Sequence, residues 1–167
     1  MSNINITTQP TGRSPENKYF FGNLTKELDL SRPKYNKIGN MEDFNAFYNQ
    51  LTGLSYKNRL RFKTVGISFL VFTNDDRHAQ FVRNMFNTED EHDDGSASDW
   101  IIFHNTEVEL SEPKIHVNLD HKIMLIGGTT FLGEIKKGVF GIVSFELPKS
   151  CLLYTSDAAD DSLRVDL

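Results

Sequence analysis

Residues 126–140 read IGGTTFLGEIKKGVF, and the interpretation of the chain starts from this stretch. It begins where an apolar run, residues 123–126, ends in a pair of glycines, as a strand entering a turn does. After Gly-Glu-Ile-Lys-Lys-Gly, apolar residues recur with helical spacing. The stretch therefore predicts a strand, a glycine-rich turn and a helix, with Lys136 and Lys137 just past the end of the strand.

The adjacent lysines indicate an anion site or a metal–nucleotide site. A lysine titrates near about 10.4, and both a neighbouring positive charge and partial burial lower the pKa of such a group. A neutral amine can bind a metal, whereas a charged one can hold a phosphate. Adjacent residues of a helix face different ways, so Lys136 and Lys137 can serve different ligand atoms. The alternative is that both lysines are solvated at the start of a helix.

Length and composition predict one domain of ordinary globular character. The chain has 167 residues, a net charge of -5 and a single cysteine. The negative charge argues against a general nucleic-acid partner, and one cysteine fits a reducing compartment. The start, MSNINITTQ, lacks the features of a signal peptide, and no apolar run reaches the ~20 residues of a membrane helix. We therefore expect a soluble, cytoplasmic protein with neither nucleic-acid nor membrane partners.

The order of apolar patterns predicts an α/β domain with a mixed sheet flanked by helices. A polar loop with one helical turn is expected over residues 22–40. The expected strands are residues 18–21, 61–73, 100–104, 114–119 and 122–126. The expected helices are residues 41–51, capped by Asn40; a helix from Asn74 or Asp75 to Phe86; and a third helix that Pro148 stops. The second helix is expected to bury Phe81, Val82, Met85 and Phe86, and to leave His78 on its surface.

Two further stretches have a functional and a structural interpretation. Residues 11–15, TGRSP, form a stiff loop that presents Arg13, and a rigid guanidinium suits bidentate capture of a carboxylate or phosphate. The alternative is a surface turn with a solvated arginine. Residues 88–98 are acidic but lack the oxygen spacing of an EF-hand loop, which favours a solvated connection.

Several catalytic motifs are absent from the sequence. Gly133 and Gly138 have the spacing of a phosphate-binding loop, but Val139 and Phe140 stand where Lys and Ser or Thr are needed. The sequence contains no GxSxG nucleophile elbow, no HExxH and no paired cysteines for zinc.

Three stretches together resemble the ATP-type phosphoenolpyruvate carboxykinases: TGRSPENKYF at residues 11–20, FTNDDRHAQFVRNMF at 72–86, and IGGTTFLGEIKKGVF at 126–140. SDWIIFHNTE at residues 98–107 resembles the family's middle strand region. The resemblance runs from about residue 6 to residue 149 and is to the family's amino-terminal domain. It implies a gluconeogenic lyase that converts oxaloacetate and ATP to phosphoenolpyruvate, carbon dioxide and ADP with Mn²⁺ and Mg²⁺.

The resemblance also implies roles for individual residues. Arg13 matches the arginine that holds the substrate carboxylate or carbon dioxide. Lys137 matches a metal ligand, and Lys136 matches a lysine that contacts nucleotide phosphate. Phe131 stands where the family usually has a substrate-contacting tyrosine; it keeps the ring and lacks the hydroxyl.

The sequence also differs from the family at its far end. It stops before the family's nucleotide-binding domain, with its phosphate-binding loop and its metal-binding His and Asp. We therefore expect a truncated carboxykinase domain over residues 1–150 that is inactive by itself. Residues 151–167, CLLYTSDAADDSLRVDL, resemble translated non-coding sequence, and the alternative is a genuine disordered tail. Two other functions stay open: a non-catalytic anion-binding module and an α/β interaction module.

Overall fold

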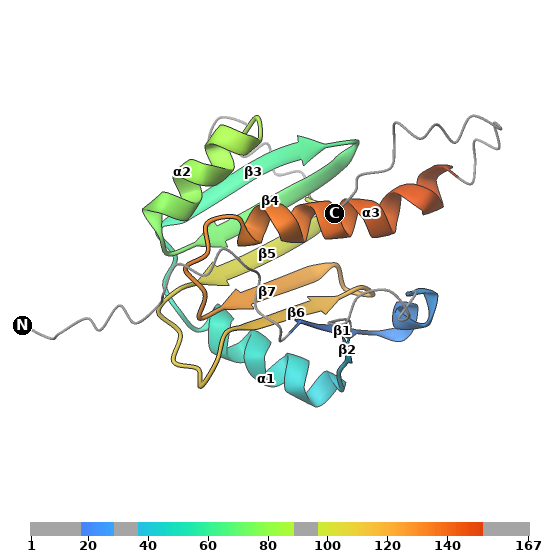
Figure 1. Cartoon of the computed structure of the whole chain (residues 1–167), viewed down its shortest axis with the longest axis horizontal. Helices are drawn as coiled ribbons and strands as arrows, with labels where there is room; N and C mark the ends of the chain where they lie inside the picture. The colour runs from blue at the N-terminus through green and yellow to red at the C-terminus, as the bar shows by residue number, and fades with distance from the viewer. Residues whose placement is uncertain (1–17, 29–36, 89–96, 152–167) are drawn as a thin grey trace, which may run out of the picture.

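The structure, a computed structural model, describes residues 18–28, 37–88 and 97–151 (Figure 1). The predictions for Arg13, for residues 89–96 of the acidic loop at 88–98, and for residues 152–167 of the tail at 151–167 concern residues outside these ranges. In chain order the elements are β1 (Lys18–Phe21), η1 (Asn23–Glu27), β2 (Lys37–Ile38), α1 (Met41–Thr52), β3 (Asn58–Thr64), β4 (Ile67–Thr73), α2 (Asp76–Met85), β5 (Trp100–Asn105), β6 (Lys114–Asn118), β7 (Ile123–Gly127) and α3 (Glu134–Cys151).

Within the described residues the strands form one seven-stranded sheet in the order β2-β1-β6-β7-β5-β4-β3. The β1–β2, β1–β6, β4–β5 and β5–β7 pairs are parallel, whereas β3–β4 and β6–β7 are antiparallel. The predicted α/β class with a mixed sheet is thus confirmed. None of the helices in these ranges has the length and apolar character needed to cross a bilayer.

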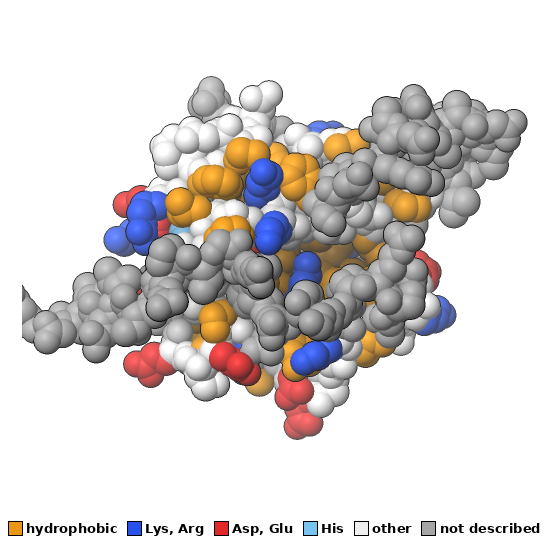
Figure 2. Space-filling view, in the orientation of Figure 1, with side chains coloured by type: hydrophobic (Ala, Val, Ile, Leu, Met, Phe, Trp, Pro, Cys, Tyr) orange, Lys and Arg blue, Asp and Glu red, His pale blue; other side chains and the backbone are white. Residues whose placement is uncertain are grey.

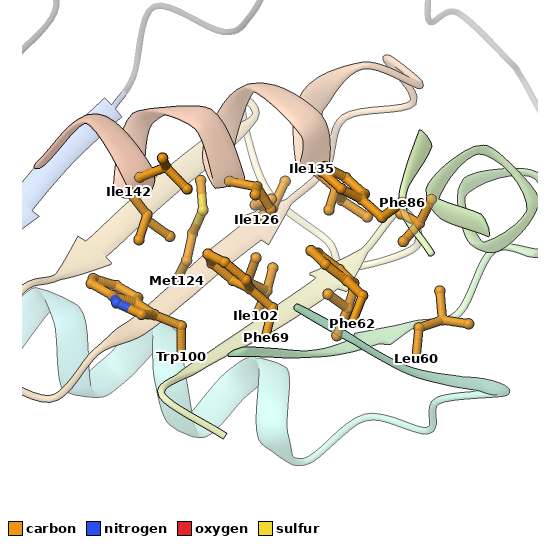
Figure 3. Close-up of a cluster of buried hydrophobic side chains, with 14 of the residues drawn as sticks. Leu60, Phe62, Phe69, Phe86, Trp100, Ile102, Met124, Ile126, Ile135 and Ile142 are labelled. Atoms are coloured by element: carbon orange, nitrogen blue, oxygen red, sulfur yellow. The ribbon is translucent and has the colours of Figure 1, made fainter. Parts of the chain in front are cut away.

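Helices cover both faces of the sheet, because side chains along a strand alternate between the faces. On β7, Met124 and Ile126 pack in a core with Ile135 and Ile142 of α3, whereas Leu125 packs in a second core with α1. Figure 3 shows the first core between the sheet and α3. The fold therefore has three layers, with α2 and α3 on one face and α1 on the other.

Two predicted helices form for the reasons read from the sequence. The Asn40 side chain accepts a hydrogen bond of 2.9 Å from the Asp43 N–H and so caps α1. The apolar face of α1 buries Phe44, Phe47 and Leu51. In α3, the side chains predicted to share a face are all buried: Ile135, Val139, Ile142 and Val143.

The prediction of one strand over residues 61–73 is wrong. The segment is a hairpin, in which β3 pairs antiparallel with β4 through a turn at Val65 and Gly66. These two residues have φ of 50° and 81°, the left-handed conformation of a tight hairpin turn. A β-branched residue rarely adopts it, so Val65 concealed the turn. The change from alternating to continuous apolar character marks the passage from the edge strand β3 to the interior strand β4.

Two helix predictions also need correction. Pro148 does not stop α3, which continues to Cys151; proline removes one backbone hydrogen bond, and the buried face already holds the helix on the sheet. Helix α2 buries His78, Ala79 and Val82, whereas Met85 is 40% exposed. The helix is therefore rotated about its axis relative to the prediction, and His78 faces the sheet.

Two glycines inside α3 should respond oppositely to alanine. A Cβ on Gly138 would overlap Cε and Sδ of the fully buried Met124, whereas the nearest atom to a Cβ on Gly141 is Lys18 Nζ at 3.7 Å. We expect Gly141→Ala to stabilise the fold by about 0.5–1 kcal/mol, the helix preference of alanine over glycine. Gly138→Ala should destabilise it by about 1 kcal/mol, because overpacking outweighs that preference.

Urea denaturation of both variants measures these two changes in the free energy of unfolding. Met124→Ala provides the control, because it removes the overlapping atoms. In that background Gly138→Ala should become stabilising, and equal responses of the two glycines in the wild-type background would contradict close packing of α3 on β7.

Candidate functional site

The turn between β7 and α3 is built from glycine conformations and backbone hydrogen bonds. Gly128 has a φ of 74°, which favours glycine, and its N–H donates to the Asn105 carbonyl at 3.0 Å. The Phe131 N–H donates to Thr129 Oγ1 at 3.2 Å, and the Glu134 N–H donates to the Phe131 carbonyl at 3.1 Å. The turn is thus held on β5 at one end and closes directly into the first turn of α3.

Phe131 and Lys137, both predicted site residues, lie together at the start of α3. The Lys137 Nζ lies 5.1 Å from the centroid of the Phe131 ring, within cation–π range. A Cβ on Gly133 would lie 2.9 Å from Phe131 Cζ, so glycine leaves the space that the ring occupies. Phe131 is half-buried and Lys137 is exposed. The ring therefore positions an amine that remains accessible to a ligand.

Lys136 contacts a different ring. Its Nζ lies 5.8 Å from the centroid of Phe140, which is itself 6.2 Å from the Phe86 ring of the segment after α2. Lys137 lies over Phe131 instead, so the adjacent lysines extend in different directions. Figure 2 shows basic side chains among hydrophobic ones on the face that α3 covers. The two amines thus lie in different surroundings, Lys136 over Phe140 and Lys137 over Phe131.

Lys18 is a third amine at this site, and the sequence interpretation missed it. Burial lowers the pKa of Lys18; the buried carboxylate of Glu134 opposes this shift, and the charge of Lys137 adds to it. Its Nζ lies 5.6 Å from the Phe20 ring centroid and close to Gly141 of α3. Alternation in β1 put Lys18 and Phe20 on one face of a strand, but the helix covering that face was not readable from the sequence.

A pair of buried histidines lies behind the turn. His78 and His104 are both 0% exposed, and their ring centroids are 4.2 Å apart. His104 Nδ1 lies 2.8 Å from Thr73 Oγ1, and His78 Nε2 lies 3.3 Å from the Phe131 carbonyl oxygen. The prediction of a surface position for His78 is therefore wrong, since the rotation of α2 places it against β5 and the turn.

The buried surroundings of His104 favour its neutral form. Burial, with a smaller contribution from His78, lowers the pKa of His104 to about 3, and the Asp75 carboxylate and the Thr129 backbone only partly oppose the shift. His104 is therefore neutral near pH 7. Asp75 caps α2 by accepting from the N–H groups of Arg77 and His78 at 2.8 and 3.3 Å. Burial by itself would raise the pKa of Asp75, but hydrogen bonds from Arg77 and His78 lower it below its ordinary range.

The described residues do not by themselves form a metal site. Within residues 18–28, 37–88 and 97–151, no group of three or more His, Cys, Asp or Glu side chains is arranged to hold a metal ion. The donor that fits is the exposed amine of Lys137, and the nearby Glu134 carboxylate is buried beside Lys18. A complete ligand set for Mn²⁺ needs further oxygen or nitrogen donors, and Arg13, predicted to share the site, lies outside the described residues.

A phosphoenolpyruvate carboxykinase family model matches residues 2–162 of the chain. The chain belongs to the ATP-dependent phosphoenolpyruvate carboxykinase family. The recognition made from residues 11–20, 72–86 and 126–140 is therefore confirmed. The single α/β domain described above is consistent with that family's amino-terminal domain. The match extends past residue 150, and the proposed domain boundary there stays a prediction.

Individual relatives agree with the family match. The chain is 29% identical over 164 residues to phosphoenolpyruvate carboxykinase (ATP) 2 of Urochloa panicoides, which covers 86% of this chain and 26% of the relative. It is 24% identical to the Geobacter sp. (strain M21) enzyme, covering 83% of this chain and 30% of the relative. It is 26% identical to the Staphylococcus aureus (strain Newman) enzyme, and this match covers 87% of this chain and 31% of the relative. The chain thus spans less than a third of the length of these three relatives.

Proposed function

We propose that this chain supplies the substrate- and metal-binding part of an ATP-dependent phosphoenolpyruvate carboxykinase. The reaction converts oxaloacetate and ATP to phosphoenolpyruvate, carbon dioxide and ADP, a gluconeogenic step that takes place in the cytoplasm. The observation that carries the proposal is the amine of Lys137, held over the Phe131 ring at the start of α3, with Lys18 of β1 near Gly141 of the same helix and influenced by the charge of Lys137. Family membership supports it, since the relatives are carboxykinases by name.

Each of the predicted site residues would bind a different part of the substrates or the metal, according to its position and charge. Lys137 would hold the metal through its amine, and Lys136, which extends in a different direction, would hold nucleotide phosphate. Arg13 would bind the substrate carboxylate or the departing carbon dioxide. Phe131 would pack against the substrate without the hydrogen bond that a tyrosine hydroxyl makes. Mn²⁺ and Mg²⁺, when bound, supply Lewis-acid neutralisation of enolate and phosphate oxygens.

The cationic cluster has a direct chemical use. Decarboxylation of oxaloacetate leaves an enolate, and phosphoryl transfer from ATP then places the phosphoryl group on the enolate oxygen. Both steps concentrate negative charge on oxygen, and positioned cations lower the free energy of such transition states. Since the family's phosphate-binding loop is not among these 167 residues, we expect the isolated chain to bind ligands without turning them over.

Metal binding by the isolated chain tests this function. Because the chain supplies only part of the proposed ligand set, we expect it to bind Mn²⁺ weakly, measured by electron paramagnetic resonance, and to show no oxaloacetate-dependent consumption of ATP. Lys137→Met should weaken Mn²⁺ binding by about tenfold or more, which is the loss of one ligand. Lys63→Met, at the exposed edge strand β3, is the matched control and should leave the affinity unchanged. Equal affinity of the wild type and Lys137→Met would rule out the proposed metal role.

A further inference from the structure

His78 connects α2 to the turn that carries Phe131. It lies two residues into α2, it is 0% exposed, and both of its ring nitrogens face oxygen atoms. Its Nε2 lies 3.3 Å from the Phe131 carbonyl oxygen, and its Nδ1 lies 3.4 Å from Asp75 Oδ1. A carbonyl oxygen can only accept, so the contact with Phe131 requires a proton on Nε2.

The Phe131 carbonyl accepts a hydrogen bond from Glu134, the first residue of α3. It accepts from His78 Nε2 and also from the Glu134 N–H at 3.1 Å, and the Lys137 N–H then donates to the Gly133 carbonyl at 2.9 Å. The first helical hydrogen bonds are normally the weakest of a helix, since its ends fray. Here one of them shares its acceptor with a side chain from a different helix, 53 residues earlier in the sequence. The orientation of the first turn of α3 is thus coupled to α2.

The position of His78 is itself restricted from several sides. His104 packs against its ring at 4.2 Å between centroids and is held by Thr73. Asp75 faces the other nitrogen and caps the same helix. Because interiors are close-packed, the imidazole cannot move without disturbing these neighbours. Figure 1 shows the turn before α3 near α2, at the end of the sheet where β7 finishes.

We propose that His78 is a positioning residue for the candidate site: its Nε2–H holds the Phe131 carbonyl and thereby orients the Phe131 ring and the Lys137 amine that lies over it. The effect on metal binding rests on the proposed function, because it assumes that Lys137 binds the metal. His78 touches neither substrate nor metal. The path of contacts runs from His78 to the Phe131 backbone, from the Phe131 ring to Lys137 Nζ, and ends at the ligand.

Two substitutions separate the hydrogen bond from the space that the ring fills. His78→Leu removes the donor, and His78→Gln retains a side-chain N–H near the same carbonyl. For His78→Leu we expect faster hydrogen exchange at the Glu134 and Lys137 amides by about tenfold, the factor that one lost hydrogen bond produces. Exchange at Leu125 in β7, more distant from this contact, reports changes in global stability. His78→Gln should restore protection at Glu134 and Lys137.

Mn²⁺ affinity distinguishes positioning from a purely structural role, because a purely structural role of His78 predicts an unchanged affinity. His78→Leu should weaken Mn²⁺ binding by about tenfold at unchanged exchange of Leu125, and His78→Gln should bind as the wild type does. Loss of amide protection with full Mn²⁺ affinity would overturn the positioning role, as would unchanged protection at Glu134. Absence of Mn²⁺ binding by the wild type would instead refute the proposed function, and the exchange data would still decide whether His78 anchors the turn.

A measurement on the wild type keeps the inference testable if His78→Leu does not fold. Long-range ¹⁵N–¹H correlation spectra at pH 7 distinguish a protonated ring nitrogen from an unprotonated one. We expect the Nε2 of His78 to be protonated and its hydrogen to exchange slowly with water. An unprotonated Nε2 cannot donate to the Phe131 carbonyl, and observing it would overturn the proposal.

Discussion

Acidification from pH 7 to pH 4 is expected to lower the free energy of unfolding by about 3 kcal/mol through His104 alone, at about 1.4 kcal/mol for each pKa unit. Burial lowers the pKa of His104 from 6.5 to about 3. Between these values the unfolded state binds a proton and the folded state does not, so stability falls as the pH falls. Above 6.5 neither state binds the proton, and this contribution to stability is constant.

His116 adds to the same acid sensitivity on the other face of the sheet. Burial, with a smaller contribution from Lys114, lowers its pKa to about 4, and Asp43 only partly opposes the shift. Its ring is 5% exposed and packs against Phe21 and Phe47, at 4.7 and 4.8 Å between centroids. These aromatic neighbours do not hydrate a charged imidazole, so the neutral form is favoured.

Urea denaturation at pH 7, 5.5 and 4 measures the effect. His104→Asn removes the titrating group and keeps a polar partner for Thr73 Oγ1, so its stability should depend less on pH than that of the wild type. The exposed His121 supplies the matched control, His121→Asn, which should keep the wild-type dependence. If His104→Asn loses as much stability between pH 7 and pH 4 as the wild type does, His104 is not the source of the acid sensitivity.

Removing the Phe62 ring is expected to cost about 3–5 kcal/mol, the usual range for truncation of a buried phenylalanine. Phe62 is 0% exposed and lies between two other rings, 5.3 Å from Phe69 and 4.3 Å from Phe86, both nearly parallel to it. Figure 3 shows these side chains in the core beneath α3. The three rings join β3, β4 and the end of α2, so Phe62→Ala leaves a cavity where these elements meet.

Phe72→Ala is the control for this prediction. Phe72 stacks on Phe103 at 5.1 Å on the opposite face of β4, but it is only half-buried, so its truncation should cost roughly 1–2 kcal/mol. The fluorescence of the buried Trp100 reports unfolding in both variants. A Phe62→Ala variant no less stable than Phe72→Ala would contradict the packing of this core.

The site was partly predictable from local patterns. The run at residues 126–140 was enough to predict a strand, a turn and a helix with Lys136 and Lys137 at its start, because glycines and apolar spacing act over a few residues. The contact of Lys137 with Phe131 follows from the same short segment. Lys18 and His78 were missed because each reaches the site across the sheet. Local sequence patterns do not predict the strand order, and therefore do not predict which distant residues it brings together.

By itself, the sequence determined the α/β class, the capped helix α1 after Asn40, the buried face of α3 and the family of the chain. These features depend on hydrophobic periodicity, capping and motifs that local residues encode. Only the tertiary structure decided that residues 61–73 belong to a hairpin, that α2 turns His78 inward, and that Lys18 reaches α3 near Gly141. Each depends on non-local packing, where burying the larger apolar surface outweighs the preference of a single residue such as Val65 or His78.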